Sequence, residues 1–176
     1  AERIDANLLD VTMEDLHDMP KQLYDGKIKK LREKTQGQLI VKEYPTASAH
    51  SGHFKSLMNE LALKKSFRPD VIFIDYLNIC ASSRFKGGNI SSYFYVKAIA
   101  EELRGLAVEF NVPIFSATQT TRTGYVSTDI GLEDTSESFG LPATADFMFA
   151  LISNEELEAL GQMKVKQLKN RYNDPS

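Results

Sequence analysis

An aspartate directly after a run of apolar residues is the first group in this sequence with the chemistry of a binding site. Asp75 follows the segment VIFI, residues 71–74, which is typical of a strand buried on both faces of a parallel sheet. A carboxylate at the carboxyl end of such a strand can bind Mg²⁺ beside the phosphates of a nucleotide. An aspartate there is also a common turn or capping residue, so this motif alone leaves both interpretations open.

A second polar strand end follows later in the chain. The segment PIFSAT, residues 113–118, is expected to form a strand, and Gln119 comes directly after it. In a parallel neighbour of the first strand, Gln119 lies at the same edge of the sheet as Asp75. Its side chain carries both a donor and an acceptor, and it can sense a terminal phosphate or orient an attacking water. The alternative is a loop glutamine in solvent.

The C-terminal tail is basic. Lys169 and Arg171 are two residues apart, so on an extended segment they share one face. A planar, permanently charged guanidinium suits phosphate recognition, including insertion into the site of a neighbouring subunit. A solvated basic edge strand that discourages aggregation explains the same spacing.

These three groups must be positioned by alternating helices and strands. Helical, charged sequence fills residues 1–35, with a capped start at 12–15 and interruptions at Pro20 and Gly26. The remaining segments are a strand at 38–44, a helix through 54–62, the strand at 71–74, a helix at 93–110, the strand at 113–118, a strand at 146–153, a capping box at 153–156 that begins a short helix, and a strand at 163–169.

Repeated alternation of strand and helix predicts an α/β fold with a mainly parallel sheet flanked by helices. The terminal strands are free to run antiparallel. A chain of 176 residues is most simply one domain, spanning residues 1–176.

Composition limits the classes of function. The formal net charge is −3, so binding to nucleic acid would require local basic clusters. No apolar run approaches the roughly 20 residues that span a bilayer, and no signal peptide is recognisable, which indicates a cytoplasmic protein. The single cysteine, Cys80, cannot form an internal disulfide and is expected to be buried.

The usual phosphate-binding loops are absent from the sequence. No G-x-x-x-x-G-K-[ST] motif occurs, because the pair Gly26 and Lys27 is followed by Ile28, and no G-x-G-x-x-G motif occurs either. Residues 1–176 therefore lack a recognisable phosphate cradle.

Four ordered segments together resemble the ATPase core of the DnaB-type replicative DNA helicases. Their sequences are most similar to those of the helicases of T-even-type bacteriophages. They are VIFIDYLNI, VPIFSATQTTR, EDTSESFGLPATADFMFALI and VKQLKNRYNDP. The resemblance implies a RecA-like fold, assembly as a hexameric ring around single-stranded DNA, and hydrolysis of ATP or another NTP between subunits with Mg²⁺. It also implies primase and a helicase loader as partners, in the cytoplasm of a bacterial host if the protein is phage-encoded.

The resemblance also assigns roles to individual residues. Asp75 matches the Walker B aspartate that serves Mg²⁺, and Gln119 matches the glutamine that senses the γ-phosphate. Arg171 matches an arginine finger offered to the neighbouring subunit, with Lys169 as its companion.

Three further residues match loops that approach DNA in the central channel, namely Arg122, Glu137 and Phe139, the last two chiefly through backbone. Bacterial members often have an arginine just before the position of Glu137, where this chain has Ser136.

In the helicases, the Walker A loop and the catalytic glutamate precede the segment that matches Ala1. We therefore expect a partial RecA-like domain, truncated at both ends, which hydrolyses ATP at background rate by itself. Two alternatives stay open at this point. One is a RecA-type recombinase ATPase, and the other is a non-catalytic α/β assembly module that binds a helicase or primase.

Overall fold

A computed structural model describes residues 2–85, 90–120, 131–132 and 140–173. Its chain contacts divide into two units, Ala1–Glu43 and Tyr44–Ser176, each of which is described by itself. The single domain expected over residues 1–176 stays a prediction. Arg122, Glu137 and Phe139 lie outside the described residues.

Three helices make up the described structure of the first unit. They are α1 (Glu2–Leu9), α2 (Met13–Asp18) and α3 (Lys21–Lys34). The predicted capping box is confirmed: Thr12 accepts from the backbone of Asp15 through its hydroxyl, and the Asp15 carboxylate accepts from the backbone of Thr12. Pro20 stands directly before α3, where a residue without an N–H is tolerated. The expected break at Gly26 was wrong, because a helix can accommodate one interior glycine at about 1 kcal/mol.

The strand expected at residues 38–44 is not formed, and neither of the two described sheets includes this segment. Leu39 and Val41, whose alternation suggested a strand, are 63% and 53% exposed. A strand needs a neighbour to satisfy its backbone groups, and alternation in the sequence cannot supply one.

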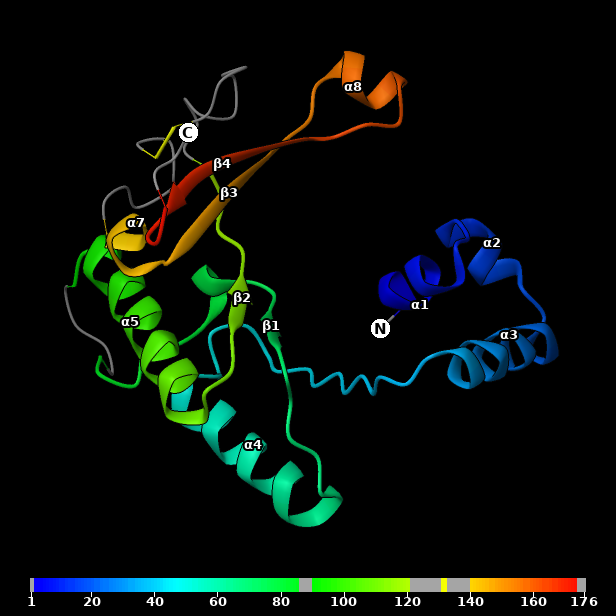
Figure 1. Ribbon diagram of the computed structural model, residues 1–176, viewed down its shortest axis with the longest axis horizontal. Coiled ribbons are helices and arrows are strands. Elements are labelled where there is room, and N and C mark those ends of the chain that lie inside the picture. Colours follow the sequence, from blue (N-terminus) through cyan, green and yellow to red (C-terminus); the bar gives the residue numbers. More distant parts are fainter. Residues whose placement is uncertain (1, 86–89, 121–130, 133–139, 174–176) are drawn as a thin grey trace. The chain divides into compact units, whose positions relative to one another are not determined.

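The second unit contains helices and two small two-stranded sheets (Figure 1). Its elements are α4 (Ser51–Lys65), β1 (Ile72–Ile74), the 3₁₀ helix η1 (Leu77–Ile79), α5 (Ser92–Phe110), β2 (Ile114–Ser116), α7 (Gly140–Thr144), β3 (Phe147–Ile152), α8 (Glu155–Ala159) and β4 (Lys164–Asn170). The order of strands and helices follows the prediction from residue 51 onward.

β1 and β2 pair in parallel, as the sequence predicted, and β3 and β4 pair antiparallel with an irregularity between Met148 and Phe149. In Figure 1, β3 and β4 form a long hairpin, and α8 lies in the connection at its far end. The capping box expected at residues 153–156 was wrong by one residue. Asn154 is the cap, and its side chain accepts from the N–H of Leu157 at 2.8 Å.

The core of the second unit centres on α5. Ile99, only 1% exposed, packs among the residues of one cluster: Leu77, Cys80, Val96, Ala100, Leu103 and Leu141, with Phe54, Ile74 and Tyr95 against it. Cys80 is buried, as expected, and this burial raises the pKa of its thiol. The core thus joins the start of the segment after β1 to the middle of α5.

The expectation that the strand at residues 71–74 is buried on both faces was wrong. Ile74 packs against the core, whereas Phe73 is 71% exposed and stacks on Phe115 of β2, with ring centroids 5.3 Å apart. Successive side chains of a strand point to opposite faces, and the described helices cover only the face of Ile74.

Candidate functional site

The ends of β1 and β2 form one edge of the parallel pair. The register joins Ile74 to Ser116, so Asp75 and Ala117 follow the two strands at the same edge. The hydroxyl of Ser116 donates to the carbonyl of Ile74 at 2.8 Å, and the N–H of Leu77 donates to the carbonyl of Ala117 at 3.0 Å. These bonds continue the pairing beyond the strands and hold the two strand-end segments together.

Asp75 and Gln119 are both exposed at these strand ends. Within the described residues, neither side chain forms a hydrogen bond or an ion pair. Next to them, the hydroxyl of Thr118 donates to Oδ1 of Asn78 at 2.8 Å, which joins the two segments again. The arrangement leaves a carboxylate and an amide available to a ligand. Their roles toward metal and phosphate stay predictions.

The donor set at this edge fits Mg²⁺ rather than a metal bound by protein alone. Magnesium commonly keeps several waters and binds through one or two carboxylates beside phosphate oxygens, which suits a single exposed Asp75. No group of three or more His, Cys, Asp or Glu side chains comes together as a metal site in the described part of the chain. His50 and His53 instead cap the start of α4 through their Nδ1 atoms.

Lys169 and Arg171 lie at the end of β4, and both donate to the C-terminal part of α7. Lys169 Nζ donates to the carbonyl of Pro142, and one terminal nitrogen of Arg171, NH2, donates to the carbonyl of Ala143 at 2.9 Å. Cations are favoured at the C-terminus of a helix, where carbonyls lack partners. The structure therefore brings together the two basic residues that the sequence singled out.

A carboxylate joins this pair of cations to the core helix. Oδ1 of Asp146 is 2.9 Å from Nε of Arg171 and 2.8 Å from NH1 of Arg104, which projects from α5. Arg104 NH1 also donates to the carbonyl of Thr144 at 3.1 Å. Burial, and then the charge of Arg171, lower the pKa of Lys169, while Asp146 opposes this change. We call Asp146, Arg104, Lys169 and Arg171 the Asp146 cluster.

No hydrogen bond or ion pair between described residues joins Lys169 or Arg171 to Asp75 or Gln119. The two groups belong to different sheets, one at the edge of β1 and β2 and the other at the end of β4. The chain thus carries two separate sets of candidate nucleotide-site residues.

A second carboxylate fixes the segment that follows η1. Glu102 of α5 accepts from the hydroxyls of Ser82 at 2.6 Å, Ser83 at 2.7 Å and Ser51 at 2.8 Å. The backbone N–H groups of Ser83 and Arg84 also donate to it, at 3.0 and 3.3 Å. Burial alone would raise the pKa of Glu102, but the hydrogen bonds from Ser82, Ser83 and Ser51 together lower it to about 2.

The sequence did not single out Asp146, Arg104 or Glu102. Their partners are distant along the chain: Arg104 and Asp146 are 42 residues apart, and Ser51 and Glu102 are 51 apart. For Glu102 and Arg104, the sequence offered one signal of an interaction: each is a charged residue within the largely apolar sequence of α5.

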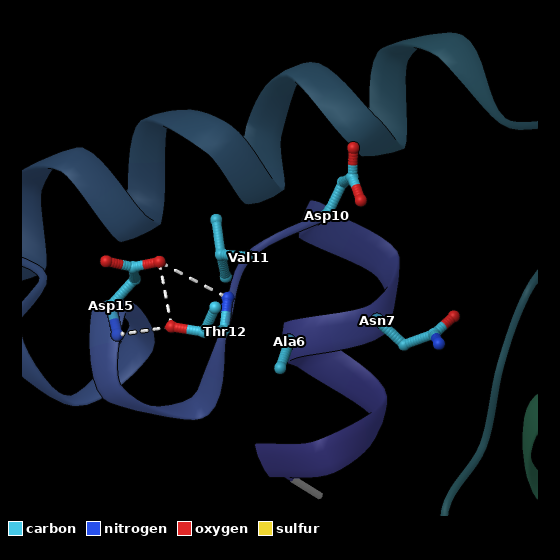
Figure 2. A pocket seen from close by; sticks show the side chains of 6 residues that line it. All are labelled: Ala6, Asn7, Asp10, Val11, Thr12 and Asp15. Atoms are coloured by element: carbon cyan, nitrogen blue, oxygen red, sulfur yellow. Dashed lines mark hydrogen bonds between the residues drawn. The ribbon is translucent and has the colours of Figure 1, made fainter. Parts of the chain in front are cut away.

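A hollow in the first unit is lined by six residues, two of which already form the capping box of α2. Its lining residues are Ala6, Asn7, Asp10, Val11, Thr12 and Asp15. Figure 2 shows that Thr12 and Asp15 are joined to each other by the capping box, and that the side chains of Asn7 and Asp10 point away from it. This hollow contains none of the residues singled out for chemistry.

Comparisons with known proteins extend the resemblance beyond the four motifs. No protein-family model matches the chain. The chain is 51% identical, over 177 aligned residues and 99% of its own length, to a DnaB-like replicative helicase of Enterobacteria phage T4. It spans 37% of the length of that relative.

Two solved structures share the fold. The first, described as an ATPase domain, matches with a TM-score of 0.75 and 17% identity, over 99% of this chain and 63% of that one. The second is a DnaB-like replicative helicase whose structure was described with its interactions with primase. It matches with a TM-score of 0.71 and 18% identity, over 97% of this chain and 43% of that one.

The fold predicted from the sequence is confirmed: it is the α/β, RecA-like fold that the two solved structures share. Among the described residues, no helix is both long enough and apolar enough to cross a membrane. The resemblance of this chain to the DnaB-type replicative helicases, predicted from four ordered motifs, is likewise confirmed, over a segment that corresponds to 37% of the phage T4 relative.

Proposed function

We propose that this chain is part of the ATP-hydrolysing motor of a replicative DNA helicase. The observation that carries the proposal is 51% identity across 99% of the chain to a DnaB-like replicative helicase, together with the exposed Asp75 and Gln119 at one edge of β1 and β2. Ligands of open α/β sheets bind outside the carboxyl ends of the strands, which is where these two residues lie.

Asp75 would bind Mg²⁺ through its carboxylate, with waters completing the coordination of the metal. The metal, when bound, would neutralise charge on the β- and γ-phosphates of ATP or another NTP. Gln119 would hold the attacking water in line with the γ-phosphorus by hydrogen bonding. The water oxygen bonds to the γ-phosphorus as the bond between that phosphorus and the β–γ bridging oxygen breaks. The water gives up a proton to solvent, and the products are a nucleoside diphosphate and phosphate.

The two cations at the end of β4 would serve a different copy of the protein. Arg171, with Lys169 beside it, would stabilise the charge that develops on the γ-phosphate bound by a neighbouring subunit. This role is supported by their position at the end of β4, in a different sheet from the strand ends that carry Asp75 and Gln119. It requires a closed ring of subunits, for which we propose a hexamer around single-stranded DNA.

The remaining partners follow from the same resemblance. We propose that the parent protein works with a primase and a loader, in the cytoplasm of its host. Contacts of Arg122, Glu137 and Phe139 with DNA in the central channel belong to the same proposal.

The test is ATP hydrolysis and fork unwinding by the longest native product that contains this segment. Asp75→Asn should lower the DNA-stimulated rate by about 10²-fold or more, because a metal ion supplies several kcal/mol of charge stabilisation. Asp70→Asn is a matched control, since Asp70 is exposed and lies before β1. Strand exchange without unwinding would instead indicate a recombinase.

The segment itself should hydrolyse ATP only at background rate. Residues 1–176 contain no G-x-x-x-x-G-K-[ST] loop to hold the phosphates. Clear hydrolysis by residues 1–176 that Asp75→Asn abolishes would contradict this part of the proposal.

A further inference from the structure

The guanidinium of Arg171 is only partly used by its own subunit. Nε pairs with Asp146 and NH2 donates to carbonyls at the end of α7, the nearest being Ala143. An arginine has five N–H donors in a rigid planar fork. Its other terminal nitrogen, NH1, donates to no described residue, so two donors of the fork are left for another molecule.

Asp146 and the carbonyls at the end of α7 together contact two of the three nitrogens of that fork. Because the guanidinium is planar, fixing Nε and NH2 also fixes the position of NH1. Asp146 is itself fixed, since its Oδ1 accepts from Arg104 of α5 at 2.8 Å. The backbone adds a further restraint, because the N–H of Arg171 donates to the carbonyl of Asp146 at 2.9 Å.

The charges of the Asp146 cluster also favour a fixed position for Arg171. Lys169, Arg171 and Arg104 are three cations around one end of α7, and without a counterion they would repel one another. Asp146 pairs with both arginines, and its side chain is 35% exposed, so the pairing is only partly screened by water.

We propose that Asp146 is a positioning residue that holds the guanidinium of Arg171 so that its NH1 group can bind the phosphate in a neighbouring subunit's site. The inference deepens the proposed function and rests on it, because it assumes that Arg171 acts on a neighbour. Asp146 itself touches no substrate. It acts through the arginine, and Arg104 ties the arrangement to the core helix α5.

The experiment mixes two impaired variants of the longest native product that contains this segment. An Asp146→Asn subunit has an intact site of its own but a badly positioned Arg171, so its rate should fall about 10- to 100-fold with little change in KM. An Asp75→Asn subunit has a dead site but a well-positioned Arg171. In mixed rings, sites of Asp146→Asn subunits that lie next to Asp75→Asn subunits should recover activity, so an equal mixture should exceed the sum of its parts severalfold.

Three controls make the outcome decisive. Arg171→Ala mixed with Asp75→Asn should also recover activity, which tests the action on a neighbour directly. Glu109→Gln removes a surface carboxylate paired with Lys55 at 2.5 Å and should leave the rate unchanged. Asp146→Glu keeps the charge and should retain more activity than Asp146→Asn, and it serves as the working variant if Asp146→Asn fails to form rings.

The inference is overturned if Asp146→Asn hydrolyses ATP at the normal rate. It is also overturned if Arg171→Ala is rescued by Asp75→Asn while the Asp146 variants are not, because the defect would then lie in their own sites. If Arg171→Ala is not rescued either, the action of Arg171 on a neighbour fails, and the proposed role of Asp146 fails with it.

Discussion

Glu102 and Asp146 both fix a segment of chain against α5, but they do so with different kinds of partner. Glu102 accepts from serine hydroxyls and backbone N–H groups, which carry no charge. Asp146 pairs with two arginines, one of which is a candidate for binding phosphate. A carboxylate surrounded by neutral donors fixes the backbone, whereas a carboxylate between cations fixes the direction of charged side chains.

The difference also separates stability from function. The described donors to Glu102 are three serines and the backbone of Arg84, and none of these residues is proposed to bind metal, nucleotide or DNA. The Asp146 cluster includes Lys169 and Arg171, which the sequence did single out. Substitution of Glu102 should therefore act mainly on folding, and substitution of Asp146 mainly on catalysis.

The largest effect on stability is expected for Glu102→Gln. The neutral amide keeps the shape but loses the charge that accepts from Ser82, Ser83 and Ser51, and its NH₂ group faces donors. We expect a loss of roughly 2–3 kcal/mol in the free energy of unfolding, because hydrogen bonds to charged groups are the strong ones. Urea unfolding measures this loss. Hydrogen exchange should show faster exchange at the N–H groups of Ser83 and Arg84.

Glu101→Gln is the matched control for that measurement. Glu101 is the neighbour of Glu102 on α5 and forms an ion pair with Arg84 at 2.5 Å, with side chains 38% and 51% exposed. Partly exposed pairs contribute at most about 1 kcal/mol. If Glu101→Gln and Glu102→Gln lost equal free energy of unfolding, Glu102 would contribute no more to stability than an exposed ion pair.

The same carboxylate should give the fold a particular dependence on pH. The pKa of Glu102 is about 2 in the folded chain, against 4.5 as the ordinary value. Its contribution is therefore complete above pH 4.5 and is lost as the pH falls from about 4.5 toward 2. Unfolding followed from pH 6 to pH 3 should show a decline that is shallower in Glu102→Gln. Parallel declines in the two proteins would show that Glu102 plays no part.

Local sequence patterns predicted the residues at the edge of β1 and β2 but missed Glu102 and Asp146, and both outcomes have one physical reason. Asp75 directly follows β1 and Gln119 is the third residue after β2, and parallel strands bring their carboxyl ends to one edge, so a local pattern was enough to find both. Glu102 and Asp146 interact with residues tens of positions away, so neither periodicity nor spacing reveals their partners. Their roles emerge only once α5 has packed against the segments on either side.

The strand that was wrongly predicted at residues 38–44 shows that a local pattern cannot supply a pairing partner. Its alternation of Leu39 and Val41 describes a segment that is able to form a strand, but pairing depends on a neighbour that this pattern does not encode. The strand at residues 71–74 was predicted correctly because β2 pairs with it. Its burial was overestimated for the same reason, since cover for Phe73 must come from another element.

The smallest effect on stability is expected at the edge where β1 and β2 end. Asp75→Asn and Gln119→Ala should each change the free energy of unfolding by no more than about 0.5 kcal/mol. Both side chains are exposed and neither bonds to another described residue, so their loss removes no interaction between described residues. Urea unfolding without nucleotide measures this difference, and the same proteins give the hydrolysis rate. A residue whose loss leaves folding intact but abolishes hydrolysis is positioned for a ligand. If Asp75→Asn instead lowered the free energy of unfolding by about 2 kcal/mol or more, Asp75 would have a structural role like that of Glu102. The proposal that the nucleotide binds at the edge of β1 and β2 would then fail.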